Sequence, residues 1–86
     1  MTTRVAVSAH PPSARWRGPL VAFLESRARE LRDHSAVRRT RVVEEEDAEP
    51  VTLVIDFAHQ NGATELVRDL VADLEALNAT PVTASG

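Results

Sequence analysis

Three histidines, His10, His34 and His59, are the side chains best suited to bind a metal ion or to transfer protons near neutral pH. No two of them have the HxH or HxxxH spacing that brings imidazoles to one face of a strand or helix. The chain has no cysteine, which excludes a disulfide framework and a thiolate-bound zinc or iron–sulfur site. Ser8 and Ser13 have no acid and base arranged with them for nucleophilic catalysis. The sequence therefore predicts no catalytic residue, no metal site and no cofactor.

A second group of polar residues lies where a predicted strand ends and a predicted helix begins. Asp56, His59, Gln60 and Asn61 precede Gly62 at this point. The free N–H groups of a helix N-terminus attract anions, so His59, Asn61 and Gly62 are a candidate anion or ligand site. A lone glycine is neither a phosphate loop nor a dinucleotide fingerprint. We favour the alternative, a solvated turn in which Asn61 caps the helix.

The triplet Arg15-Trp16-Arg17 contains the only tryptophan, between two arginines. Such a triplet can stack on bases, bind phosphates or anchor a protein interface. The alternative, which we favour, is that the arginines pair with the acidic run Glu44–Glu49 while Trp16 covers the end of the core.

The segment that positions these residues is a strand followed by a helix. Residues 51–58 alternate between two faces, with Val51, Leu53, Ile55 and Phe57 on the apolar one. Leucines and other apolar residues then recur at helical spacing from Ala63 to Leu77. Asn78 can end the helix in a left-handed conformation, and the Thr80-Pro81 pair prevents its continuation. The leucine stripe, Leu77 included, is expected to pack on the apolar face of the strand.

Four further elements complete the chain. Strands are predicted over Thr3–Ser8, Val37–Val43 and Pro81–Ala84, the last from the weakest pattern. The second of them reads VRRTRVV, and charges at this density are typical of a strand at a sheet edge. A helix starts at Gly18-Pro19 and ends near Asp33. Its expected buried stripe is Leu20, Phe23, Leu24, Ala28 and Leu31.

This order, strand, helix, strand, strand, helix, strand, predicts an α+β ferredoxin-like fold, a four-stranded antiparallel sheet with two helices on one face. We expect the 86 residues to form one such domain. The third strand then lies beside the first, with Arg4 opposite Asp56, Ala6 opposite Val54 and Ser8 opposite Thr52. On its other side we expect Arg38 opposite Asp56 and Thr40 beside Val54.

The face of the sheet without helices is the predicted functional surface. Its expected centre is Ala6, Thr40 and Val54, with Arg4, Arg38 and Asp56 at the rim and Trp16 as a second candidate contact. Phe23 and Phe57 are expected in the core and there is no tyrosine, so the face lacks the aromatics on which RNA bases stack. The chain is therefore interpreted as a small non-catalytic adaptor, a homodimer or the partner of another protein. A ligand-binding or monooxygenase-like enzyme that uses a cavity between sheet and helices is the alternative.

Charge is divided unevenly, with +6 in residues 1–41 and −9 in residues 42–86. The two halves are expected to interleave in the fold and to neutralise one another. The N-terminus has no apolar signal-peptide core, and no stretch approaches the about 20 apolar residues that span a bilayer. We expect a cytoplasmic protein without a membrane partner.

The segment LVIDFAHQNGATELVRDLVADLEALNATPVTASG resembles the strand, turn, helix and closing strand of the effector-associated constant component domains of actinobacterial conflict systems. Members of that family carry a more glycine-rich turn than AHQNG. The resemblance implies a non-catalytic adaptor encoded beside an effector.

Overall fold

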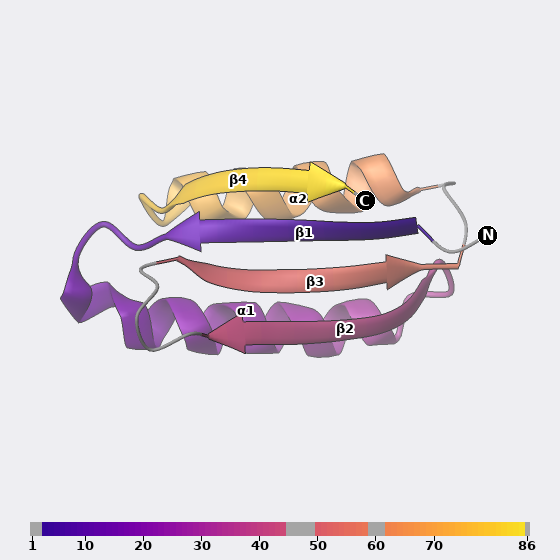
Figure 1. The fold of residues 1–86 in the computed structure, drawn as a ribbon, viewed down its shortest axis with the longest axis horizontal. Helices are drawn as coiled ribbons and strands as arrows, with labels where there is room; N and C mark the ends of the chain where they lie inside the picture. The colour runs from indigo at the N-terminus through magenta and orange to yellow at the C-terminus, as the bar shows by residue number, and fades with distance from the viewer. Residues whose placement is uncertain (1–2, 45–49, 59–61, 86) are drawn as a thin grey trace.

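The computed structural model describes residues 3–44, 50–58 and 62–85. Four strands form one antiparallel sheet in the order β2-β3-β1-β4 (Figure 1). They are β1 (Thr3–His10), β2 (Val37–Glu44), β3 (Val51–Phe57) and β4 (Thr80–Ser85). Two helices, α1 (Arg17–Arg32) and α2 (Ala63–Ala76), lie on one side of the sheet. The fold is therefore ferredoxin-like, as the order of elements predicts, and the strongly charged β2 is an edge strand.

The core lies between the sheet and the two helices. The four alternate residues of β3, Val51, Leu53, Ile55 and Phe57, are fully buried, and β1 adds Val5, Val7 and Ala9. Helix α1 covers β2 and β3, whereas α2 covers β1 and β4. The helices bury Leu20, Leu24, Ala28, Ala63, Leu70 and Leu74 against these strands. Phe23 and Leu31 are only partly buried.

The C-terminal end of α2 departs from the predicted stripe. Leu77 lies just beyond the helix, and 46% of its surface is exposed. Asn78 takes the left-handed conformation (φ 63°), as predicted, and the Ala79 amide donates to the Leu74 carbonyl at 3.0 Å. This turn brings Ala79 into the core at the end of the helix and leaves Leu77 outside, so the prediction of a buried Leu77 was wrong.

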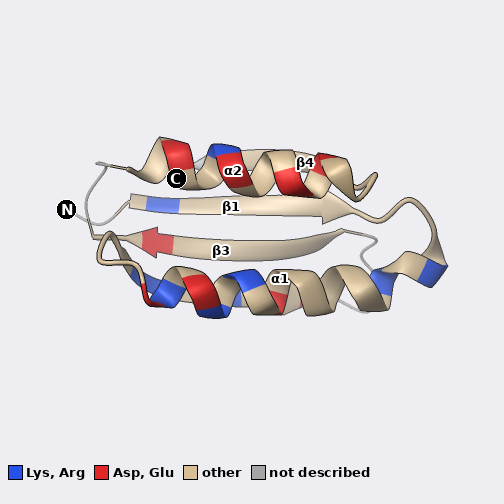
Figure 2. Cartoon of the chain, turned by 180° about the vertical axis from the view of Figure 1, so that it is seen from behind, with Lys and Arg blue, Asp and Glu red and all other residues tan. Residues whose placement is uncertain are grey.

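The outer sides of the helices are charged. Acidic side chains predominate on α2, while α1 mixes both signs (Figure 2). The Arg27 guanidinium of α1 forms an ion pair with Asp73 of α2 and lies 5.4 Å from the centre of the Phe23 ring. Basic first-half and acidic second-half residues therefore do meet within the fold at this point.

Strand β3 pairs with β1 in a regular register, whereas its pairing with β2 contains an irregularity. Toward β1 the observed pairs are Arg4 with Asp56, Ala6 with Val54 and Ser8 with Thr52, as predicted. Toward β2 the register shifts between Val37 and Arg39. The extra residue in a bulge turns every later side chain of the strand to the other face. The pairs are therefore Arg39 with Asp56 and Arg41 with Val54.

Candidate functional site

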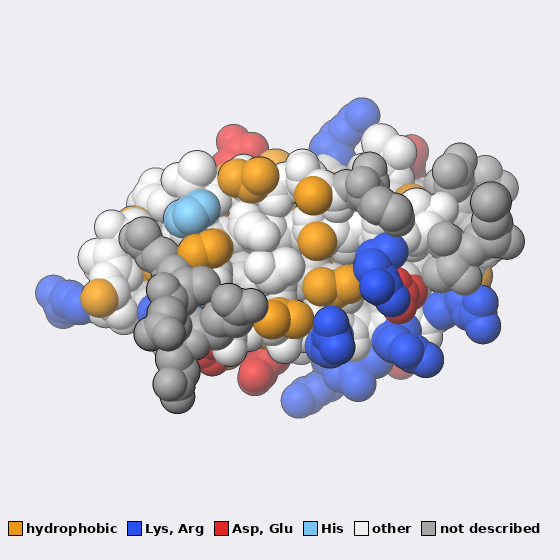
Figure 3. Space-filling view, in the orientation of Figure 1, with side chains coloured by type: hydrophobic (Ala, Val, Ile, Leu, Met, Phe, Trp, Pro, Cys, Tyr) orange, Lys and Arg blue, Asp and Glu red, His pale blue; other side chains and the backbone are white. Residues whose placement is uncertain are grey.

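The face of the sheet opposite the helices, here called the open face, carries hydrophobic side chains along its middle (Figure 3). Ala6 and Val54 are half-buried neighbours at its centre. Ser8 and Thr52 lie beside them, with 2.9 Å between their hydroxyl oxygens. Val82 of β4, opposite Ser8, is 53% exposed. The middle of the face therefore offers apolar surface that the chain's described elements leave uncovered.

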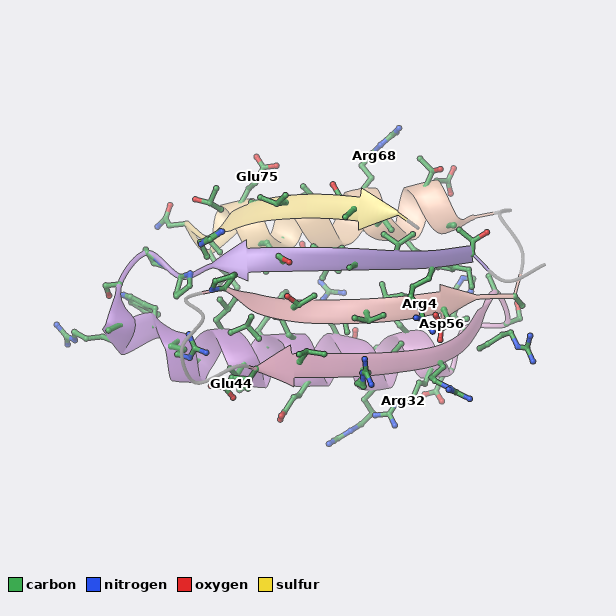
Figure 4. All side chains as sticks on the ribbon, in the orientation of Figure 1. Arg4, Arg32, Glu44, Asp56, Arg68 and Glu75 are labelled. Atoms are coloured by element: carbon green, nitrogen blue, oxygen red, sulfur yellow. The ribbon has the colours of Figure 1, made fainter. Side chains whose placement is uncertain are left out.

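One end of the open face is basic. Arg4 and Arg39 stand on the strands that flank Asp56, and Arg41 is the neighbour of Val54. The Arg4 Nε donates a hydrogen bond of 2.8 Å to Oδ1 of Asp56, and Figure 4 shows the two side chains turned toward each other. We call Arg4, Arg39, Arg41 and Asp56 the arginine cluster. It borders a hollow of about 230 Å³ that also includes Val54.

Asp56 is the only buried charged side chain among the described residues. Its pKa lies below the ordinary value, first because Arg4 donates a hydrogen bond to the carboxylate. Burial opposes this shift, while the positive charges of Arg4, Arg39 and Arg41 reinforce it. The carboxylate is therefore ionised at neutral pH and holds Arg4 in place.

The bulge corrects two of the predicted contact residues. Thr40 is not on the open face, because it is the partner of the core residue Ile55 and its hydroxyl donates to the Ala28 carbonyl of α1 at 3.0 Å. Arg38 is the extra residue of the bulge, so the residue opposite Asp56 in the strand register is Arg39. Arg39 and Arg41 occupy the positions expected for Arg38 and Thr40. Two adjacent arginines in VRRTRVV hide this shift from the sequence, since either can be the extra residue.

The Arg15-Trp16-Arg17 triplet partly follows its prediction. Arg17 Nε donates to Oε1 of Glu44 at 3.1 Å, so one arginine does pair with the start of the acidic run. Trp16 ends a short 3-10 helix, η1 (Ala14–Trp16), and is 56% exposed, so it covers the end of the core at most in part. Its ring borders a small apolar pocket of about 120 Å³ with Phe23 and Leu77, away from the open face.

The two described histidines, His10 and His34, lie at separate points of the fold. His10 ends β1 opposite Thr80, and His34 accepts a hydrogen bond from the Ala36 amide through Nδ1. The described residues contain no group of three side chains able to hold a metal ion. His59, Gln60 and Asn61 fall outside the described residues, and Gly62 precedes α2 with φ 83°.

A larger groove of about 580 Å³ lies where the first turns of α2 meet the strand ends. Its described lining is Thr3, Val5, Ala63, Thr64, Val67, Thr83 and Ala84. None of these side chains titrates near neutral pH. These described side chains can thus offer hydroxyl groups and apolar contacts to a ligand, but none of them is an acid or a base.

No family model matches the chain, and no curated protein matches its sequence. Solved structures do match its fold over its full length. Rv0793 from Mycobacterium tuberculosis superposes with a TM-score of 0.79 at 15% identity, over 100% of this chain and 93% of that one. A Deinococcus radiodurans protein, provisionally named an antibiotic biosynthesis monooxygenase, superposes with a TM-score of 0.78 at 17% identity. The match covers 100% of this chain and 90% of that one. SnoaB, a cofactor-independent oxygenase from Streptomyces nogalater, superposes with a TM-score of 0.60 at 11% identity. The match covers 99% of this chain and 87% of that one.

The likeness is one of fold. At these identities it shows a ferredoxin-like fold, which the chain shares with proteins named as oxygenases, and it assigns no activity to the chain. Within the described ranges no helix is long and apolar enough to cross a membrane.

Proposed function

We propose that the protein is a non-catalytic interaction module that binds a second copy of itself through the open face. The observation that supports this is the contrast between the two sides of β3. Leu53 and Ile55 are fully buried on the helix side, whereas Val54 between them is only half-buried on the other. A second copy would cover the apolar middle of the face, centred on Ala6 and Val54.

The size of the face suits a modest dimer. Four strands about 4.8 Å apart and about seven residues long give a face of roughly 450 Å² per copy. Two such faces bury roughly 900 Å², near the lower limit for a specific interface. The expected association is therefore reversible in solution.

Both edges of the sheet disfavour the competing mode, in which strands pair edge to edge. The outer strand β2 presents Arg39 and Arg41, and the outer strand β4 contains Pro81, which has no amide hydrogen to donate. The arginine cluster sets the orientation on the face. A two-fold axis across the strands would place each cluster over the far end of the partner's face, near His10 and Val82, so that the clusters do not repel each other.

The test is the solution mass as a function of concentration for the native protein and two variants. Val54→Arg places a charge at the centre of the face, and Ala72→Arg places the same charge on an exposed position of α2. We expect a native dimer, a folded Val54→Arg monomer and an Ala72→Arg dimer. A native monomer at every concentration, or a Val54→Arg dimer as tight as the native one, would refute the proposal. A native monomer that binds an effector protein through the same face would instead agree with the adaptor implied by the sequence resemblance.

The groove beside α2 supports a second candidate, the binding of a small neutral ligand. Its volume of about 580 Å³ lies in the range of ligand pockets, and three threonines, Thr3, Thr64 and Thr83, line it. Two of the fold's structural neighbours are named as oxygenases. Fluorescence of the neutral apolar dye Nile red should rise in the native protein and not in Thr83→Trp, whose ring would fill the groove. Equal dye binding by both proteins would exclude the groove.

A further inference from the structure

The arginine cluster holds more positive charge than its carboxylate can neutralise. Arg4, Arg39 and Arg41 surround one Asp56, which leaves an excess of two positive charges at neutral pH. Asp56 accepts its hydrogen bond from Arg4. Among the described residues no ion pair or side-chain hydrogen bond ends on Arg39 or Arg41, although both charges act on Asp56.

The register keeps these like charges close together. Arg4 and Arg39 lie on the two strands that flank Asp56, so each is its direct cross-strand neighbour. Arg41 follows Arg39 by two residues on the same face, about 7 Å further along β2. These like charges repel one another, and an anion with more than one charge between the guanidinium groups would reduce that repulsion.

The cluster also has room for such an anion. The hollow of about 230 Å³ is bordered by the three arginines, Asp56 and Val54. A liquid water occupies about 30 Å³, so the space accepts a five-atom oxyanion together with several waters. Figure 3 shows the basic side chains gathered around one acidic group at this end of the open face.

We propose that the arginine cluster binds a phosphoryl group, either as free phosphate or as a small phosphate monoester. A phosphoryl group carries about 1.5 to 2 negative charges at pH 7, which matches the excess charge of the cluster. The planar guanidinium fork pairs with two oxygens at once, so Arg39 and Arg41 would bind the group directly. Arg4, held through Nε by Asp56, keeps its terminal N–H groups for a third contact. The site is complete in one copy of the chain and does not depend on self-association.

Amide chemical shifts of the native protein titrated with sodium phosphate, at constant ionic strength maintained with chloride, test the proposal. Saturable shifts are expected in β2, β3 and β1 around the cluster. Methyl phosphate in a parallel titration distinguishes the two sources, since an ester site should bind it at least as tightly as inorganic phosphate.

Three variants make the test specific. Arg39→Gln and Arg41→Gln should each weaken phosphate binding about ten-fold or more, the loss expected for hydrogen bonds to a charged group. Arg68→Gln, an exposed arginine of α2, removes the same charge elsewhere and should bind as the native protein does. All three sites are exposed, and an unchanged amide spectrum without phosphate confirms the fold. No saturable binding by the native protein, or an equal loss in Arg68→Gln, would overturn the proposal.

Discussion

The two faces of the sheet are made from the same strands, yet they differ in what covers them. On the helix side, Leu53 and Ile55 lose all contact with solvent. On the open side, Val54 stays half-exposed, and the buried Asp56 accepts a hydrogen bond from the exposed Arg4. One face therefore stabilises the fold of the single chain, while the described elements leave the other face uncovered.

Truncation of neighbouring β3 residues should show the largest difference in stability between the two faces. Leu53→Ala removes fully buried carbons and should lower the free energy of unfolding by about 2 to 5 kcal/mol. Val54→Ala removes half-exposed carbons and should cost about 1 kcal/mol or less when the chain is monomeric. Urea unfolding at low protein concentration measures both. Equal losses would contradict the contrast between the faces.

Adjacent valines of β2 test where the bulge places each side chain. Val42 packs against the core, and Val43 is the partner of Thr52 on the open face. Val42→Arg should therefore lower the free energy of unfolding by about 2 kcal/mol or more, because it places a charged side chain against the core. Val43→Arg should change the free energy of unfolding by no more than about 0.5 kcal/mol. Urea unfolding of the two variants checks this, and the reverse order would mean that the register predicted from the sequence was right after all.

Asp56 gives the open face a dependence on pH. Its pKa is lower in the folded chain than in the unfolded one, so its contribution to stability is complete above the unfolded value near 3.8. That contribution is lost as the pH falls through the folded value. The stability difference between the native protein and Asp56→Asn should therefore shrink below about pH 4, as measured by urea unfolding at each pH. A difference that stays constant down to pH 2 would show that Arg4 does not stabilise the ionised carboxylate.

Much of the fold could be predicted from the sequence, because large apolar residues alternate in β3 and recur at helical spacing in α1 and α2. The pairing of β1 with β3 follows for the same reason, since a slip by one residue would expose Val5 and Val7. In β2 the hydrophobic residues that pack in the core are Val37 and Val42. An alternation this weak does not determine the register, and the bulge at Arg38 escaped prediction.

The candidate site was predictable only in part. Arg4, Ala6, Val54 and Asp56 lie on the open face as expected, because their neighbours in β1 and β3 are buried. Arg39 and Arg41 could not be assigned to it without the bulge. The exposure of Trp16 was also hidden, since it depends on the 3-10 turn that precedes α1.

The most direct measurement of the central claim is the reactivity of a single cysteine on each face of the molecule. The chain has no native cysteine, so Val54→Cys reports on the open face alone and Arg68→Cys on the outer side of α2. Alkylation rates would be measured from micromolar to millimolar protein. Self-association through the open face predicts that the thiol at position 54 becomes slower to react as concentration rises, while the thiol at position 68 reacts at a constant rate. A position 54 thiol whose rate does not change with concentration would contradict the account.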